Sequence, residues 1–310
     1  MNDVIVYTHK DCFLKFNGNN HPERKERIET VNNSLKKINN VIFKESENTS
    51  LENIYLVHPE MYVKNLFNMI PNEGLKSVEK EPYADTYLCP NSKNAILKSV
   101  GAGINASDDL IKNKSKRFFC SIRPPGHHAE KIRANGFCFF NNIAITAKYL
   151  INKYSINKIG IIDFDVHHCN GTQDIFIDQE NVFLGSIHQS PLFPGTGSKD
   201  EKGKNNIFNA PIKAGTESKE FIDIFKKTII ENLDKFKPEV ILISAGFDAH
   251  KRDPLANINL ESKDFFYLTK IITDLANIHC EGRIISFLEG GYDLIALEEA
   301  IQEHIKALMI

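Results

Sequence analysis

Lys158-Ile-Gly-Ile-Ile-Asp-Phe-Asp-Val-His-His-Cys-Asn-Gly171 is the stretch of the chain that says most about the fold. Its first part is an almost uninterrupted apolar run, which is typical of a strand buried on both faces of a parallel sheet. Its second part is polar, with Asp163, Asp165 and His167 at alternate positions. Alternate residues of an extended chain point to the same side. We therefore predict a buried strand over Lys158–Val166 that presents polar side chains at its C-terminal end.

Similar apolar runs occur along the whole chain and alternate with longer amphipathic stretches. The other predicted strands are Val4–Tyr7, Arg117–Ile122, Val182–His188, Val240–Gly246 and Arg283–Glu289. The predicted helices are Glu23–Lys37, Ser92–Lys112, Asn141–Tyr154, Ser218–Phe236, Ser262–His279 and Asp293–Leu308. Strands that alternate with helices form parallel sheets with helices on both faces. We therefore predict an α/β fold in which residues 1–310 form a single domain.

The composition is that of a globular protein, with 42% apolar and 25% charged residues, and it excludes a disordered chain. The 38 basic and 40 acidic side chains give a net charge of −2, so neither nucleic acid nor an anionic membrane is expected as a partner. No apolar run is long enough for a spanning helix or a signal peptide, and the six cysteines form no CxxC pair. We expect a cytoplasmic protein with reduced thiols; the oligomeric state stays open.

Histidines and aspartates gather where the predicted strands end. In open α/β sheets, ligands bind beyond the C-terminal ends of the strands. Burying so many polar groups for structure alone would cost several kcal/mol, so a functional site is the simpler explanation. The residues at these ends are His127, His128, His167, His168, His188, Asp163, Asp165 and Asp248.

Two carboxylates and one imidazole, from Asp165, His167 and Asp248, suit a divalent first-row metal. Three protein ligands leave a fourth position for water, which is typical of catalytic rather than structural zinc. The competing interpretation, capping aspartates and packed histidines, explains one Asp-x-Asp but not the whole cluster. The adjacent pair His127-His128 follows Pro-Pro-Gly and suits proton transfer in hydrolysis.

Three further sequence features can be interpreted only from their place in the predicted fold. Asp163 and Asn170 are the nearest candidates to fix the tautomers of the two histidines. Tyr292, after Gly290-Gly291, is either a functional phenol or a packed aromatic residue. Gly101–Ala106 fits the dinucleotide-binding pattern G-x-G-x-x-A, but it lies inside a predicted helix, where that pattern indicates helix packing.

Six motifs in order resemble those of the zinc-dependent histone deacetylase family, in the form of its class II members and their bacterial relatives, and the resemblance runs from about His21 to Tyr292. They are RPPGHHAE (123–130), NGFCFFNN (135–142), DFDVHHCNGTQ (163–173), SIHQSPLFPGTG (186–197), SAGFDAHKRDPL (244–255) and EGGYDL (289–294). The resemblance implies the arginase/deacetylase fold, a central parallel sheet of about eight strands with helices on both faces.

The resemblance also implies the roles of the clustered residues. One zinc ion per chain would be held by Asp165, His167 and Asp248. His128 would act as general base and then as general acid, and His127 would help to bind and polarise the attacking water. Zinc and iron(II) remain alternatives for the native metal.

Further roles follow from the same motifs. Asp163 and Asn170 would orient the two histidines, and Tyr292 would donate a hydrogen bond to the substrate carbonyl. Asn170 stands where class I members carry Asp. Because an amide carries no charge, His128 would receive less electrostatic help in becoming an imidazolium ion.

The substrate would enter a narrow tunnel. Phe137 and Phe193 would form its walls, Gly136 would line it, and Leu255 would lie at its rim. The family also binds a structural potassium ion, mostly through backbone carbonyls. Here the residues implied for potassium are Asp163, Asp165, His167 and Ser186.

The function implied is removal of acetyl or other acyl groups from lysine side chains in proteins or peptides. The main alternative is an acetylpolyamine amidohydrolase, which uses the same machinery on a small acetylated amine. We favour acyl-lysine, because a polyamine-selective relative carries Glu at the position of Leu255. An arginase-like two-metal hydrolase and a non-catalytic acyl-lysine-binding protein are further alternatives.

Overall fold

The computed structural model describes residues 2–79 and 84–310. Its centre is a sheet of eight strands, all paired in parallel, in the order β2-β1-β5-β10-β9-β6-β7-β8. The strands are β1 (Val4–Thr8), β2 (Val41–Glu45), β5 (Arg117–Cys120), β6 (Ile159–Asp163), β7 (Val182–Gln189), β8 (Ile207–Ile212), β9 (Val240–Ala245) and β10 (Ile284–Leu288). A separate antiparallel pair joins β3 (Lys76–Ser77) to β4 (Tyr87–Leu88). The predicted α/β class and central parallel sheet are confirmed.

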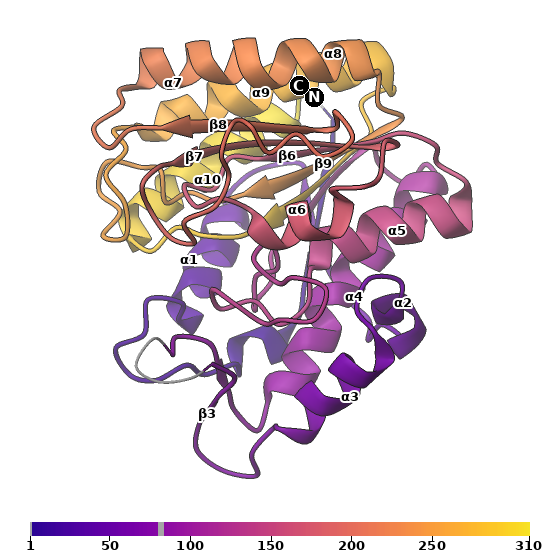
Figure 1. The fold of residues 1–310 in the computed structure, drawn as a ribbon, viewed down its shortest axis with the longest axis vertical. Coiled ribbons are helices and arrows are strands. Elements are labelled where there is room, and N and C mark those ends of the chain that lie inside the picture. Colours follow the sequence, from indigo (N-terminus) through magenta and orange to yellow (C-terminus); the bar gives the residue numbers. More distant parts are fainter. Residues whose placement is uncertain (1, 80–83) are drawn as a thin grey trace.

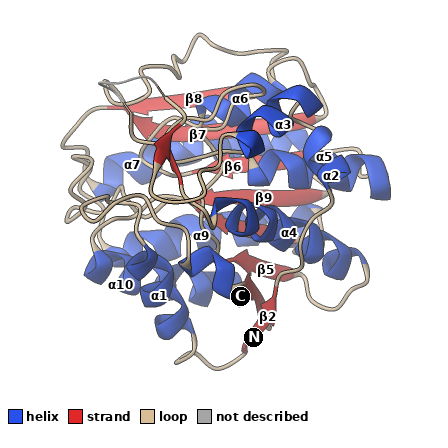
Figure 2. Cartoon of the chain, turned by 90° about the horizontal axis from the view of Figure 1, so that it is seen from below, coloured by secondary structure: helices blue, strands red, loops and turns tan. Residues whose placement is uncertain are grey.

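Helices cover both faces of this sheet (Figures 1 and 2). One apolar core lies between the sheet and α1 (Lys25–Leu35), α7 (Ser218–Phe225), α8 (Glu231–Phe236), α9 (Ser262–His279) and α10 (Leu294–Leu308). The opposite core contains α4 (Ser92–Ile111), α5 (Asn142–Tyr154) and α6 (Asn170–Phe176). A third cluster joins α2 (Leu51–Tyr55) and α3 (Glu60–Asn68) to α4 and α5. Among the described residues, no helix is both long and apolar enough to cross a bilayer.

The structure differs from the sequence prediction chiefly at the edges of the sheet. β2 and β8, which were not predicted, are the two outermost strands. β2 is partly exposed along its length and β8 contains Pro211, so neither has the continuous apolar pattern of a central strand. The predicted helix Ser218–Phe236 is divided by a π-helical turn at Lys226–Ile230.

The predicted strand Lys158–Val166 ends at Asp163, so the polar residues that follow belong to a loop. Asp163 pairs with Ser186 of β7 on one side and with Ser244 of β9 on the other. The loops after β6, β7 and β9 therefore leave the same edge of the sheet, which is where an α/β fold places its ligands.

Candidate active site

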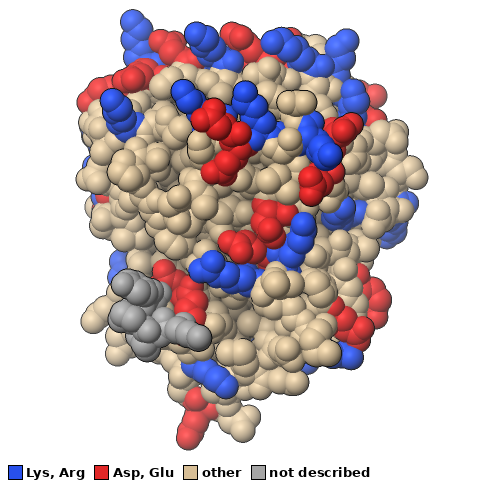
Figure 3. Space-filling model, viewed as in Figure 1, with Lys and Arg blue, Asp and Glu red and all other residues tan. Residues whose placement is uncertain are grey.

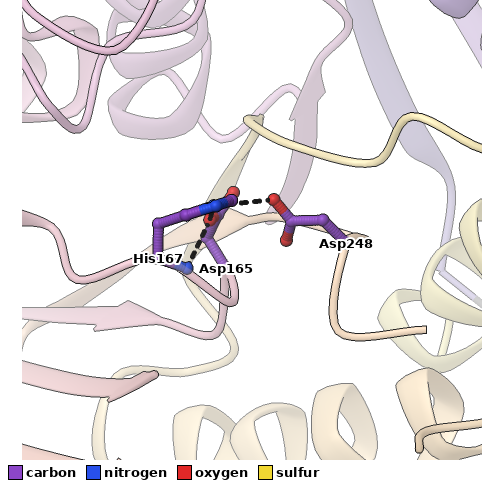
Figure 4. Close-up of side chains that lie close together, drawn as sticks. All are labelled: Asp165, His167 and Asp248. Atoms are coloured by element: carbon purple, nitrogen blue, oxygen red, sulfur yellow. Dashed lines mark hydrogen bonds and ion pairs between the residues drawn. The ribbon is translucent and has the colours of Figure 1, made fainter. Parts of the chain in front are cut away.

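Asp165, His167 and Asp248 meet at the C-terminal edge of the sheet (Figure 4). The first two follow β6 and the third follows β9. His167 Nδ1 lies 3.1 Å from Asp165 Oδ1 and 3.1 Å from Asp248 Oδ2. All three residues are buried, and their donor atoms lie within 4.8 Å of one another. The structure thus brings together the three predicted metal ligands.

The spacing and the charge of these donors fit a divalent cation. Two donors that each lie about 2.0–2.1 Å from a tetrahedral zinc ion are separated by about 3.3 Å, close to the observed 3.1 Å. Burial lowers the pKa of His167, but the carboxylates of Asp165 and Asp248 have the larger effect and raise this pKa to about 10. The cluster therefore attracts positive charge, as expected of buried carboxylates that bind a metal ion.

Backbone amides hold the outer oxygens of the two carboxylates. The Val166 N–H donates to Asp248 Oδ1 at 2.9 Å, and the Gly290 N–H donates to Asp165 Oδ2 at 2.8 Å. A Cβ at position 290 would lie 2.0 Å from Asp248 Oδ2, so only glycine allows the backbone to approach this closely. These bonds fix the orientation of the ligands before any ion binds.

The two catalytic histidine candidates have different partners. His127 Nδ1 donates to Asp163 Oδ2 at 2.9 Å, and His128 Nδ1 donates to Asn170 Oδ1 at 2.8 Å. Burial lowers the pKa of His127, but Asp163 and neighbouring carboxylates raise it to about 10. Burial and the neighbouring imidazoles lower the pKa of His128 well below its usual value. The surroundings therefore favour the protonated form of His127 and the neutral form of His128.

Glu289 anchors the loop that carries the two histidines. This buried side chain at the end of β10 accepts hydrogen bonds from the backbone of Gly126 at 2.8 Å and of His127 at 3.3 Å. Ser244 Oγ donates to its other oxygen at 3.3 Å. The sequence analysis placed Glu289 at a strand end but did not predict this function.

Tyr292 is held from both sides. Its backbone N–H donates to Asp253 Oδ2 at 2.7 Å, and the guanidinium of Arg27 stacks on its ring at 4.8 Å. Arg27 Nε also donates to the carbonyl of Gly291 at 2.6 Å. The Tyr292 side chain lines the same cavity as the two histidines, and its hydroxyl has no hydrogen-bond partner in the described part of the chain. The phenol is therefore available to a ligand.

A cavity of about 270 Å³ leads down to these groups. All four predicted tunnel residues line it: Gly136, Phe137, Phe193 and Leu255. Gly136 has φ +52°, and a Cβ there would lie 2.5 Å from His128 Cδ2. The Phe193 ring meets His128 edge-on, with centroids 5.0 Å apart. Apolar walls therefore end on the two histidines, His167 and Tyr292.

Asp85 also lines this cavity, and the sequence analysis missed it. Thr86 Oγ1 donates to its Oδ1 at 2.9 Å. Burial and the nearby Glu79 raise the pKa of Asp85 to about 7. A larger hollow of about 710 Å³ shares Asp85 and Phe193 with the tunnel but contains none of the metal-ligand candidates. Asp85 follows no strand-end motif, so no sequence pattern pointed to it.

The residues implied for potassium also lie together. Asp163 is the direct neighbour of Ser186 across β6 and β7, and Asp165 and His167 follow in the next loop. The potassium ion itself stays a prediction.

Comparison with known proteins agrees with this geometry. Residues 21–308 match the family model described as "Histone deacetylase domain". The chain belongs to the histone deacetylase family. It is 34% identical to "Histone deacetylase 10, chloroplastic" of Oryza sativa subsp. japonica, over 93% of this chain and 70% of that protein. It is 33% identical to "Probable deacetylase" of Archaeoglobus fulgidus, over 94% of this chain and 81% of that protein.

Other family members are much longer. The chain is 32% identical to "Type-2 histone deacetylase 2" of Dictyostelium discoideum, over 99% of this chain but 21% of that protein. Among solved structures, it is similar to the HDA15 HD domain, with a TM-score of 0.92 and 28% identity over 99% of this chain and 88% of that one. The resemblance to the histone deacetylase family is confirmed, and family membership supports a deacetylase or related amidohydrolase with a metal cofactor.

Proposed function

We propose that this protein is a zinc-dependent amidohydrolase that removes acetyl or other acyl groups from lysine side chains in proteins or peptides. The observation that carries the proposal is the apolar cavity between Phe137 and Phe193. It ends on His167, one of the three buried metal-ligand candidates, with Tyr292 and His128 beside it. Such a cavity suits a neutral alkyl chain whose amide reaches the polar base.

Zinc bound by Asp165, His167 and Asp248 would polarise the amide carbonyl and acidify the attacking water. Tyr292 donates a hydrogen bond to the carbonyl oxygen and stabilises the negative charge that develops there.

The two histidines divide the proton transfers. His128, neutral and hydrogen-bonded to Asn170, takes a proton from the attacking water and passes it to the leaving amine. His127, paired with Asp163, contributes positive charge beside the water. The products are the free lysine amine and a carboxylate. Burial of the whole set in an apolar cavity strengthens these electrostatic interactions.

Two residues that line the cavity, Leu255 and Asp85, help to decide between an acyl-lysine and an acetylpolyamine substrate. Leu255 lines the cavity, and at the rim implied by the family resemblance its apolar side chain would pack against the uncharged stem of an acyl-lysine. Asp85, in the same cavity, also suits the second candidate, an acetylpolyamine, because its ionised form attracts ammonium groups. A carboxylate also accepts hydrogen bonds from peptide N–H groups. Since Asp85 suits both substrates, the apolar rim leads us to favour acyl-lysine.

A turnover panel tests the proposal. It compares kcat/KM for acetyl-lysine peptides, peptides with longer acyl chains, N-acetylspermidine and N-acetylputrescine, with arginine as a control for two-metal arginase chemistry. We expect the highest value for an acyl-lysine peptide and no hydrolysis of arginine. A higher kcat/KM for the acetylpolyamines would reassign the substrate, and no turnover of any amide would refute the proposed activity.

Three other features of the proposal rest on the sequence: one zinc ion per chain, a structural potassium ion at Asp163, Asp165, His167 and Ser186, and a cytoplasmic location. On the face shown in Figure 3, acidic and basic side chains are interspersed. That the protein does not bind nucleic acid directly stays an expectation, which rests on the net charge of −2.

A further inference from the structure

Asn170 lies between a catalytic histidine and an acid that the sequence analysis did not consider. Its Oδ1 accepts a hydrogen bond from His128 Nδ1 at 2.8 Å, and its Nδ2 donates to Glu130 Oε1 at 2.7 Å. The same Nδ2 lies 3.4 Å from the carbonyl oxygen of His128. The three side chains form a continuous hydrogen-bonded chain from Glu130 to the ring of His128.

The chemistry of the three groups allows one arrangement of protons. An ionised carboxylate only accepts hydrogen bonds, so the NH₂ end of Asn170 must face Glu130. If the amide were flipped, its oxygen would face two acceptors, Glu130 Oε1 and the His128 carbonyl. The oxygen therefore faces His128, whose Nδ1 must carry the hydrogen. Nε2 of the same neutral ring is then left as the acceptor.

We propose that Glu130 is a positioning residue that fixes the tautomer of His128 through Asn170. Its effect on turnover rests on the proposed function, whereas its effect on the tautomer does not. Glu130 also places a carboxylate behind an amide that carries no charge, so it stabilises the imidazolium that forms when His128 accepts a proton.

A simple surface ion pair does not explain the position of Glu130. Its closest cation is Arg133, at 4.0 Å, and the Arg133 side chain is 62% exposed. Exposed pairs of this kind contribute little, whereas the contact with Asn170 is short, at 2.7 Å, and partly buried. Arg133→Gln is therefore the matched control, because it removes the ion pair and leaves the Asn170 contact intact.

The first test is kinetic. Glu130→Gln offers both a donor and an acceptor to Asn170, so it no longer fixes the amide. We expect kcat to fall about 10-fold, the lower end for a residue that orients a catalytic group, with KM and zinc content unchanged. In an Asn170→Asp background, two carboxylates would face each other, so the same substitution should leave kcat unchanged or raise it. Equal losses in both backgrounds, or a loss matched by Arg133→Gln, would contradict the proposal.

The second test reads the tautomer itself. Nitrogen NMR of histidine-labelled protein, with the His128 signals identified by comparison with His128→Ala, distinguishes an Nδ1–H from an Nε2–H ring. We expect the Nδ1–H form in the wild type and a mixture in Glu130→Gln. A His128 tautomer that is unchanged in Glu130→Gln overturns the inference. If the wild type hydrolyses no amide, the proposed function fails, but this measurement still tests Glu130.

Discussion

At the scale of single residues, Tyr292 is the group whose function depends most on its surroundings. Arg27 and Asp253 hold its ring and backbone, and its side chain lines the cavity. Within the described residues, no structural hydrogen bond occupies its hydroxyl. We predict that Tyr292→Phe lowers kcat by about 10²-fold or more, as expected for the loss of one oxyanion donor. Steady-state kinetics, with zinc content and circular dichroism as controls, measure this effect. Near wild-type turnover in a folded, zinc-loaded variant would make Tyr292 a packing residue.

A substitution at Leu255 tests the preference for acyl-lysine over acetylpolyamine substrates. A Glu at this rim position would add a carboxylate to the one that Asp85 already provides. A close, partly desolvated pair with a substrate ammonium contributes about 1 kcal/mol or more. We predict that Leu255→Glu raises kcat/KM for N-acetylspermidine relative to an acetyl-lysine peptide. Leu255→Gln, which adds polarity without charge, is the matched control. A ratio that changes equally in both variants would exclude the electrostatic explanation.

At the scale of elements, the start of α1 is tied to the site by a buried ionic cluster. Glu23, just before the helix, accepts from Arg27 at 3.3 Å and from Arg123 at 2.9 Å, and none of the three is exposed. Arg27 in turn binds the backbone carbonyls of Glu289 and Gly291 on the Tyr292 loop. Removing one member of such a cluster leaves buried charges without compensation.

We predict that Glu23→Gln lowers the free energy of unfolding by about 3–5 kcal/mol, measured by urea denaturation. Burial raises the pKa of Glu23, but Arg123 and Arg27 have the larger effect. The pKa of Glu23 therefore falls from 4.5 to about 2. A carboxyl whose pKa is lower in the folded state stabilises the fold above pH 4.5 and loses that effect as the pH falls toward about 2. The difference between wild type and variant should therefore shrink over that interval. Glu29→Gln, which breaks the exposed pair with Lys25, should change stability little.

The same scale shows what a sequence can and cannot predict. Central strands such as β9 are recognisable because burial on both faces requires continuous apolar residues. The edge strands β2 and β8 are half-exposed or contain proline, so their patterns resemble those of loops. Residues that follow central strands were brought together as predicted. Asp85 was missed because it lines the cavity without following such a strand, and the contact of Glu130 was missed because its partner, Asn170, lies 40 residues further along the chain.

At the scale of the whole molecule, the parallel sheet brings five separate loops to one edge, and two buried carboxylates and an imidazole converge there. Among the described residues, this is the one cluster of His, Cys, Asp and Glu side chains close enough to hold a metal ion. The cluster supplies one set of three ligands, which is the basis for proposing one zinc ion per chain rather than the two metals of an arginase-like hydrolase.

Titration of zinc into the metal-free protein tests this central claim most directly. The protein is stripped with a chelator, and hydrolysis of an acetyl-lysine peptide is measured as zinc is returned in known amounts. We expect no activity without metal, a linear rise, and saturation at one equivalent of zinc per chain. Asp248→Ala, which removes one ligand, should show neither the rise nor tight zinc binding. Full activity in the chelated protein, or saturation only at two equivalents, would contradict a single-metal deacetylase.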